Sequence, residues 1–352
     1  MSLSEIVTEL ISKGEEIAEE VIKQMKKAKE IVQEIKGNEL PSSNKDFSLN
    51  ELEVGAVDGG MGKVELTATT IILIKSFGGI FNQNSTPKWI KRAHIEAITL
   101  SRNIDNYVRL LREILEIETA IELAKKNIDY LLLDGSLATL AERGIPWAFL
   151  APLQRKGEID LTENKKKFII PYKRFIKSLD RLFKMCESRN TLLIGVSKDS
   201  RAKYLKINDE IPSFTDSALV SLALKDKTGF IGPIKVSIKR DPGITDLLRN
   251  EKVLLNRDKF FTFYVKLKPH AKPFRFDLLP NSEQRTEDAL KLFLALEDGH
   301  GFILPPHFVH NQATVSQEEI SLVTENIKHQ ILAKAPIAYN LLLSPRRRDF
   351  FG

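Results

Sequence analysis

Two aspartates, Asp58 and Asp134, each follow an apolar run and precede a glycine. The first lies in VGAVDGGMGKVEL, which is not a phosphate-binding loop, because Val64 follows Gly62-Lys63 where that motif requires Ser or Thr. An Asp-Gly hairpin turn is one interpretation of Asp58, and a helix N-cap is one interpretation of Asp134. If both residues end neighbouring strands, their carboxylates meet, and the pair predicts a metal site instead.

A third acid lies on the predicted helix between these aspartates, in VRLLREILEIETAIELA. A helical wheel at 100° per residue places Glu118 within the apolar face, and it places Glu113 and Glu116 outside that face. A buried carboxylate without a partner is costly, so Glu118 should be salt-bridged, protonated or bound to a cation. A solvated Glu118 remains an alternative, and Glu116 remains the other candidate for a ligand on this helix.

A fourth acid, Asp216, lies near the start of a later predicted helix. Carboxylates gathered within about 5 Å repel by on the order of 4 kcal/mol for each close pair, so only divalent cations make such a cluster stable. Two Mg²⁺ or Mn²⁺ ions about 4 Å apart would activate water and stabilise the leaving oxygen of a phosphodiester. We therefore predict a metal-dependent phosphodiesterase site, with Gly59 and Gly60 leaving the backbone open to a phosphate.

Basic residues near these acids could contact a substrate phosphate. Lys198 follows a buried strand, and a surface ion pair with Asp199 is the alternative. His310 is interpreted as orienting water or protonating the leaving group, or else as a structural loop residue. With His300 and His307 it could also belong to a separate histidine metal site, although no carboxylate or Cys pattern completes one.

The elements that must position these residues follow from hydrophobic periodicity. Residues 3–36 predict one long helix with a heptad seam that includes Val7 and Ile11, packed on its own domain or on a second chain. Three runs rich in β-branched residues then predict an antiparallel meander of strands at 53–58, 63–77 and 89–100.

The remaining predicted elements alternate between helices and buried strands. They are a helix at 103–126, a strand at 128–137, a mostly helical stretch at 138–190 with a basic loop at 165–167, a strand at 191–200, a helix from 214, strands near 229–238 and 260–268, and helices near 282–296 and 316–333. This order of elements and acids is that of ribonuclease H-like nucleases. The predicted fold is therefore α/β, a ribonuclease H-like mixed sheet flanked by helices, with helical insertions.

The predicted domain organisation has three parts. Residues 1–38 form the N-terminal helix, residues 39–340 form the nuclease domain with a helical insertion at about 138–190, and residues 341–352 form a tail with an Arg triplet and Phe350-Phe351. The basic runs at 165–167 and 346–348 are interpreted as solvated charge or as phosphate contacts without sequence preference.

Composition restricts the class of protein. The chain has 352 residues and one cysteine, Cys186, so an internal disulfide and a thiolate zinc site are excluded. The acidic N-terminus is unlike a signal peptide, and no run of 18 apolar residues occurs, so we expect a cytoplasmic protein with no membrane association. Lys and Arg exceed Asp and Glu by 53 to 47, which favours a polyanionic partner.

Five motifs resemble the NurA nuclease family across nearly the whole chain. They are VDGG at 57–60, LLLDGSL at 131–137, GVSKDSR at 195–201, FTDSALV at 214–220 and LPPHFVHNQA at 304–313. The resemblance implies a Mn²⁺-dependent nuclease of ribonuclease H-like fold that degrades DNA from 5′ ends and cuts single strands. It also implies a homodimer around a central channel, and a partner in the hexameric helicase-translocase HerA during double-strand-break processing.

Transferred residue by residue, the resemblance implies a role for each of the acids and basic groups above. Asp58 and Asp134 would bind metal together with a helix glutamate, for which we choose Glu118. The other implied site residues are Lys198 as a phosphate contact or electrostatic support, Asp216 as the fourth acid and His310 near the scissile phosphate. Phe308-Val309 before His310 depart from the Tyr-rich family motif, so no aromatic hydroxyl is expected there. Arg201 and Lys203 are expected to bind DNA with Lys198.

The predicted function is therefore a metal-dependent DNA nuclease, acting as a 5′–3′ exonuclease on single- and double-stranded DNA and as a single-strand endonuclease. Its expected partners are single-stranded DNA, DNA ends, a second copy of the chain and a HerA-type motor. One alternative is a ribonuclease H-like nuclease that acts on RNA or an RNA–DNA hybrid. The other is a non-catalytic DNA-binding subunit of a motor complex, which would have no need of clustered acids.

Overall fold

The structure is a computed structural model of the 352-residue chain. It describes residues 3–42, 52–99, 104–143, 163–198, 200–205, 214–238, 240, 249–253 and 258–339. The helices and strands within these ranges are α1 (Leu3–Ile31), η1 (Val32–Glu34), β1 (Val54–Glu65), β2 (Thr69–Asn82), β3 (Ser85–Thr99), α2 (Ile104–Ala124), β4 (Tyr130–Asp134), α3 (Leu137–Glu142), α5 (Glu163–Ser188), β5 (Leu192–Ser197), α6 (Asp216–Leu224), β6 (Gly229–Ser237), β7 (Lys259–Lys266), β8 (Phe274–Leu278), η3 (Pro280–Arg285), α8 (Thr286–Ala295), α9 (Leu304–Ala313), α10 (Gln317–Lys334) and α11 (Pro336–Ala338).

Within the described ranges, eight strands form one mixed sheet in the order β3-β2-β1-β4-β5-β8-β7-β6. The meander β1-β2-β3 is antiparallel, β1 pairs in parallel with β4, and β4 pairs in parallel with β5. Strands β8, β7 and β6 continue the sheet in antiparallel pairs beyond β5. The predicted fold class is confirmed: a ribonuclease H-like α/β sheet carrying three additional strands.

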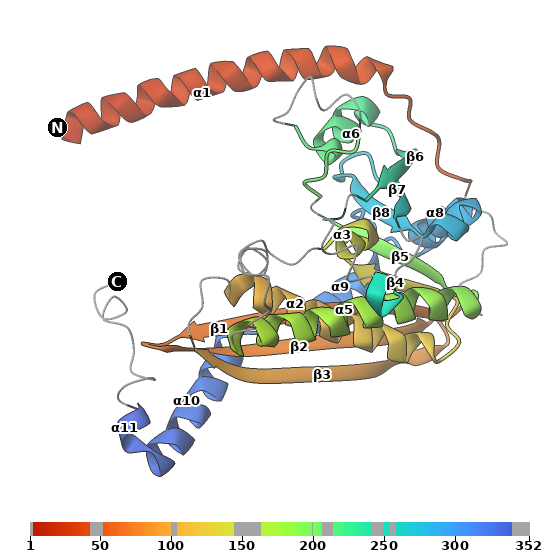
Figure 1. Ribbon diagram of the computed structural model, residues 1–352. Helices are drawn as coiled ribbons and strands as arrows, with labels where there is room; N and C mark the ends of the chain where they lie inside the picture. Colours follow the sequence, from red (N-terminus) through yellow and green to blue (C-terminus); the bar gives the residue numbers. More distant parts are fainter. Residues whose placement is uncertain are drawn as a thin grey trace.

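Helices cover both faces of the sheet (Figure 1). On one face, α2, α3 and α5 bury apolar side chains against Val57, Leu131 and Leu133. On the other face, α8 and α9 pack against Ala56 and Leu132, the neighbours of these residues along β1 and β4. Successive side chains of a strand point to opposite faces, so these two cores record the alternation of β1 and β4.

Strand β1 differs from the strand predicted at 53–58, because it continues through Asp58 to Glu65. The expected hairpin turn at 59–62 is therefore wrong, and the turn lies at residues 66–69, where the Leu66 amide donates to the Thr69 carbonyl. Asp58 pairs with Phe77 in the middle of the β1–β2 ladder. The strand can continue past Asp58 because β2 still satisfies its backbone after the pairing with β4 has ended.

Two elements near the site were not predicted from the sequence. Strand β8 is only five residues long and carries the charged residues Arg275 and Asp277, both of which are buried. Helix α9 begins at Leu304 and carries Pro305 and Pro306 in its first turn. Such a pair is commonly associated with loops, yet proline is well suited to the first helical turn. Residues 165–167, predicted as a basic loop, lie within α5, and residues 144–162 of the predicted insertion lie outside the described residues.

Helix α1 projects away from the rest of the molecule (Figure 1). Its last part packs against α6, through Ala28 and the following Val32 on Leu219. The seam residues Val7 and Ile11 are exposed by 46% and 60%, so packing of this part of the seam on its own domain is wrong. The C-terminal tail from residue 340 lies outside the described residues. Of the helices in the described ranges, none combines the length and the apolarity that crossing a bilayer requires.

Candidate active site

Asp58 and Asp134 lie at the same level of two neighbouring parallel strands. The β1–β4 ladder pairs Val54 with Tyr130 and ends with Val57 opposite Leu133, one residue before each aspartate. Asp58 comes two residues after Ala56, and Asp134 comes two residues after Leu132. Residues two apart on a strand share a face, so both aspartates face the side of the sheet that α9 covers. The predicted meeting of the two carboxylates is confirmed.

Helix α9 brings His310 to the two aspartates. His310 Nδ1 lies 2.6 Å from Asp58 Oδ2, and the other Asp58 oxygen accepts a 2.6 Å hydrogen bond from the Gly59 amide. Within the described ranges, Asp58, Asp134 and His310 form the group of acid and histidine side chains whose potential ligand atoms all lie within 4.8 Å of one another. The separate metal site considered for His300, His307 and His310 does not form among these residues, because His310 turns to the aspartates instead.

The glycines after Asp58 make room for protein rather than for a substrate phosphate. A Cβ on Gly59 would lie 2.5 Å from Glu116 Oε1, and a Cβ on Gly60 would lie 2.0 Å from the Ala313 carbonyl oxygen. The expectation that both glycines leave the backbone open to a phosphate is therefore wrong. Their small size lets Glu116 of α2 and the end of α9 lie directly against β1.

Glu116, and not Glu118, is the α2 carboxylate beside Asp58. Glu116 is 3% exposed, and its Oε1 lies 3.2 Å from Arg112 Nη1 with no hydrogen-bond partner. The same Arg112 nitrogen donates a 3.1 Å hydrogen bond to the carbonyl oxygen of Gly59. Arg112 therefore links the helix carboxylate to the backbone that follows Asp58. Arg112 and Glu116 are four residues apart, about one helical turn, and this spacing is the sequence signal that could have identified them as an ion pair.

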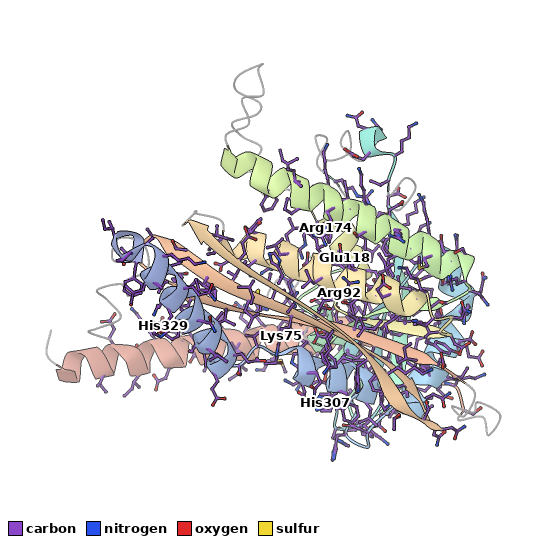
Figure 2. The ribbon with its side chains drawn as sticks, turned by 90° about the horizontal axis from the view of Figure 1, so that it is seen from below. Lys75, Arg92, Glu118, Arg174, His307 and His329 are labelled. Atoms are coloured by element: carbon purple, nitrogen blue, oxygen red, sulfur yellow. The ribbon has the colours of Figure 1, made fainter. Side chains whose placement is uncertain are left out.

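Of the three outcomes expected for Glu118, the structure shows the salt bridge, so the choice of Glu118 as the helix carboxylate beside the aspartates is wrong. It accepts hydrogen bonds of 2.6 and 2.7 Å from Arg174 of α5 and lies 4.0 Å from Arg92 of β3. Figure 2 shows Glu118 between these two arginines. The wheel assumed one buried face, whereas α2 is covered by the sheet on one side and by α5 on another, which also buries Glu113 and Glu116.

The site holds several carboxyl groups close together, and the positive charge of the nearby basic side chains does not fully compensate them. Burial, followed by the nearby Asp58 carboxylate, raises the pKa of Asp134 from 3.8 to about 6. Burial also raises the pKa of Glu116 well above 4.5, although Arg112 opposes the change. The Glu116 carboxylate in turn raises the pKa of Arg112. Native carboxylates whose pKa values rise in this way gain from a bound cation.

These residues fit a divalent cation. Carboxylate oxygens of Asp58 and Asp134 and an imidazole nitrogen of His310 supply a compact donor set, and the Glu116 oxygen without a hydrogen-bond partner lies behind it. Carboxylates favour Mg²⁺ and Mn²⁺, and an imidazole donor favours the softer Mn²⁺ of these two.

The turn after Asp134 is fixed by an acid that sequence analysis missed. Gly135 has a φ of +105°, a conformation that side chains other than glycine rarely adopt. The Ser136 hydroxyl donates to Asp277 Oδ2, and the same carboxylate accepts hydrogen bonds from the Ala138 amide and, on its other oxygen, from Thr262. Asp277 of β8 thus ties the start of α3 to the sheet and orients the strand end that carries Asp134.

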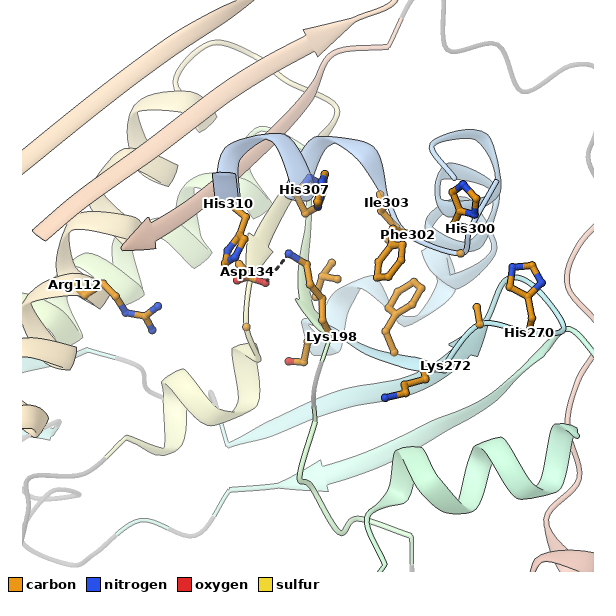
Figure 3. A pocket seen from close by; sticks show the side chains of 17 residues that line it. Arg112, Asp134, Lys198, His270, Lys272, His300, Phe302, Ile303, His307 and His310 are labelled. Atoms are coloured by element: carbon orange, nitrogen blue, oxygen red, sulfur yellow. Dashed lines mark ion pairs between the residues drawn. The ribbon is translucent and has the colours of Figure 1, made fainter. Parts of the chain in front are cut away.

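A cavity of about 790 Å³ opens from the acid–histidine group. Lys198 lines it, with its Nζ 3.9 Å from Asp134 Oδ1 (Figure 3), and its role as a phosphate contact stays a prediction. Arg201 and Lys203 are exposed on the segment after β5 and do not line the cavity. Their expected contact with DNA stays a prediction.

Asp216 is not brought to the acid–histidine group. It is fully buried at the start of α6, where it accepts hydrogen bonds from the Tyr204 and Leu205 amides and from the Tyr264 hydroxyl. These donors hold the segment after β5 against α6 and β7. The predicted position of Asp216 as a fourth clustered acid is therefore wrong, because its oxygens accept hydrogen bonds that stabilise the fold.

The fold and the site define a ribonuclease H-like α/β protein with two aspartates and a histidine arranged to bind a cation. A family model described as the NurA domain matches residues 52–315, which include all of these side chains. The chain therefore belongs to the NurA family.

Solved NurA structures have a similar fold. The NurA nuclease from Sulfolobus solfataricus is 17% identical, with a TM-score of 0.70 and coverage of 95% of this chain and 98% of that one. A NurA structure with manganese is 15% identical, with a TM-score of 0.63 and coverage of 90% and 97%. A NurA bound to dAMP and manganese is 15% identical, with a TM-score of 0.60 and coverage of 99% of both chains. No curated protein matches the chain.

Proposed function

We propose that this chain is a metal-dependent DNA nuclease that hydrolyses phosphodiester bonds. The observation that carries the proposal is the group formed by Asp58, Asp134 and His310 beside a cavity lined by basic side chains. Membership of the NurA family supports it, as do the related structures with manganese and with dAMP.

Asp58 and Asp134 would hold the metal, with His310 or Glu116 completing the ligand set. The proposed cofactor is Mn²⁺, or Mg²⁺, with two ions in each site. When bound, the ions would activate water and neutralise the charge that develops on the cleaved phosphate. Asp58 would be held in place for this role by the Gly59 amide on one carboxylate oxygen and by His310 on the other.

The chain's own side chains supply binding and orientation. Lys198 would hold a phosphate oxygen of the substrate, since its ammonium group lines the cavity beside Asp134. Arg112 keeps Glu116 against the Gly59 backbone and so fixes the acid behind Asp58. His310 would donate a hydrogen bond from Nδ1 to Asp58. Alternatively, it would transfer a proton from Nε2 to the leaving oxygen of the phosphodiester.

The finer activity that we propose is 5′–3′ exonucleolytic cleavage of single- and double-stranded DNA, together with endonucleolytic cleavage of single strands, in the repair of DNA ends. The chain would act as a homodimer with a HerA-type hexameric helicase-translocase that delivers separated strands. The exposed apolar residues Val7, Ile11 and Val21 of α1 support an intermolecular contact, because a seam of this kind is stabilised when a partner helix covers it.

The test is cleavage of single-stranded DNA by the purified full chain in Mn²⁺, compared with cleavage by Asp58→Asn. We expect activity that requires the metal and the aspartate. Efficient cleavage of RNA or of an RNA–DNA hybrid, with single-stranded DNA left whole, would overturn the DNA assignment. DNA binding without cleavage by the wild-type protein in either metal would instead indicate a non-catalytic subunit.

A further inference from the structure

The cavity beside the acid–histidine group has a second basic end. Figure 3 shows Lys198, Asp134 and His310 on one side, His270 and His300 on the other, and Phe302 in between, with Lys272 below. His270 and Lys272 come from the connection between β7 and β8, and His300 and Phe302 come from the connection between α8 and α9. The far end is therefore built from two loops that contribute nothing to the acid–histidine group.

These two loops are held together by specific contacts. Gly301 has a φ of +91°, and a Cβ there would lie 2.4 Å from the Cβ of Ala271, so the loops lie in direct contact. Lys268 of one loop pairs with Glu297 at the base of the other at 3.1 Å. Asp298 Oδ1 accepts hydrogen bonds from the amides of His300 and Phe302, which holds both side chains in place beside the cavity.

Cationic and imidazole side chains outnumber carboxylates in the lining of the cavity. Its lining contains Arg112, Lys198, Lys272 and the imidazoles of His270, His300, His307 and His310, against the single carboxylate of Asp134. Lys198 is already engaged with that carboxylate at 3.9 Å, whereas Lys272 has no ion-pair partner among the residues that the structure describes. Lys272 and the two histidines of the far end are all exposed, so an anion can reach them from solvent.

We infer that the far end of this cavity, formed by His270, Lys272 and His300, is a subsite for a second phosphate of the bound strand, and that Phe302 stacks on a base between this phosphate and the cleaved one. The inference rests on the proposed function and adds a substrate contact to it. A volume of about 790 Å³ is within the range of small-ligand sites and is sufficient for one or two nucleotides. Phe302 is 57% exposed at the cavity wall, as a stacking platform must be.

The phosphate could be a free 5′-terminal group or an internal diester, and both present the same oxygens to the subsite. A terminal phosphate would be favoured by the extra charge of the monoester. An internal phosphate would make the subsite a general contact with the strand.

The experiment measures binding of fluorescent dT oligonucleotides by the full chain in EDTA, so that cleavage does not contribute. The variants are the double substitution Lys272→Ala/His300→Ala, the single substitution Phe302→Ala, and Lys227→Ala as a matched control on the exposed turn after α6. The oligonucleotides carry a 5′-phosphate or a 5′-hydroxyl, and a circular strand without ends is the third probe. Nuclease assays in Mn²⁺ with the same variants accompany the binding assays.

We expect the double variant to bind more weakly and to lose about 0.7 from the slope of log K against log salt, the value for one phosphate contact on a single strand. Phe302→Ala should weaken binding by about tenfold, and Phe302→Trp should restore it. Lys227→Ala should behave as wild type. A loss confined to the 5′-phosphorylated probe identifies the terminal phosphate, and an equal loss on the circular strand identifies an internal one.

Unchanged affinity and salt slope in the double variant, in a protein that still cleaves DNA, would overturn the subsite and leave the proposed function intact. A wild-type protein that neither binds nor cleaves single-stranded DNA would overturn the proposed function itself. Equal weakening by Lys227→Ala would show that general surface charge, rather than the cavity, is responsible.

Discussion

Asp58 and Asp134 stand one residue beyond Val57 and Leu133, the last backbone pair between β1 and β4. The register of the parallel ladder places the two aspartates side by side, and the alternation of side chains along each strand points both to the same face of the sheet. The position of one carboxylate therefore determines that of the other. Both belong to strands buried on two sides, which makes the spacing of the pair a property of the sheet rather than of a loop.

Replacement of Asp58 by Asn should abolish nuclease activity and leave the fold intact. We expect a loss on the order of 10⁴-fold in kcat/KM, the scale seen when a residue of a catalytic group is removed. Asp134→Asn should behave in the same way, because the two carboxylates would share the metal. Glu39→Gln is the matched control, since Glu39 is exposed and follows Asn38, which bridges to Phe230 of the edge strand β6. Wild-type turnover by Asp58→Asn in Mn²⁺ would refute the site.

The two α2 glutamates offer a direct comparison within one helix. Glu116→Gln should lower Mn²⁺ affinity or activity by about 10- to 100-fold, as expected for a carboxylate that supports or completes a ligand set. Glu118→Gln removes ion pairs with Arg174 and Arg92 and should leave turnover unchanged. Calorimetric Mn²⁺ titration and steady-state kinetics of both variants check this. The reverse result would restore Glu118 as the helix ligand.

Metal-free protein should lose stability as pH rises through about 6. The native state raises the pKa of Asp134 from 3.8 to about 6, so between these values it holds more protons than the unfolded chain does. The contribution of Asp134 to stability is therefore fully present below about pH 4 and is lost as the pH rises through about 6. The raised pKa of Glu116 acts in the same direction.

Thermal melts in EDTA and in Mn²⁺ at pH 5 and pH 7.5 measure this effect. We expect Mn²⁺ to raise the melting temperature by several degrees more at pH 7.5, because protons compete with the metal at pH 5. Asp134→Asn should reduce the pH dependence of the metal-free protein between pH 4 and 6, leaving the part that comes from Glu116. An equal metal-induced shift at both pH values would contradict the assignment of Asp134.

Asp216→Asn should destabilise the protein and spare its chemistry. The carboxylate accepts hydrogen bonds from two backbone amides and from Tyr264, and an amide group would present a donor to one of them. We expect a loss of about 1–3 kcal/mol in the free energy of unfolding. Mn²⁺ affinity and turnover per folded molecule should stay at wild-type values. Loss of metal binding in a stably folded Asp216→Asn protein would make Asp216 part of the site after all.

The aspartate pair and the strands that carry it could be predicted from sequence, because the apolar run before each Asp-Gly indicates a buried strand. The continuation of β1 past Asp58 and the short strand β8 could not. The position of the helix glutamate could not. A wheel orders residues around one axis, whereas the burial of Glu116 and the ion pairs of Glu118 depend on where α5 lies over α2.

Asp277 and Asp216 show a second limit of sequence reasoning. Both are buried acids, yet their oxygens accept hydrogen bonds from hydroxyls and amides that come from distant segments. Nothing in the local sequence separates an acid that binds a cation from one that satisfies backbone donors. Only the partners that the fold brings to each carboxylate make that distinction.

His310 reaches Asp58 across 252 residues of sequence. During synthesis, β1 and β4 with both aspartates leave the ribosome well before α9, so a nascent chain holds the carboxylates without the imidazole. A chain that ends before α9 by truncation or proteolysis is in the same state. The order of the elements along the chain therefore delays assembly of the complete acid–histidine group until α9 has been synthesised.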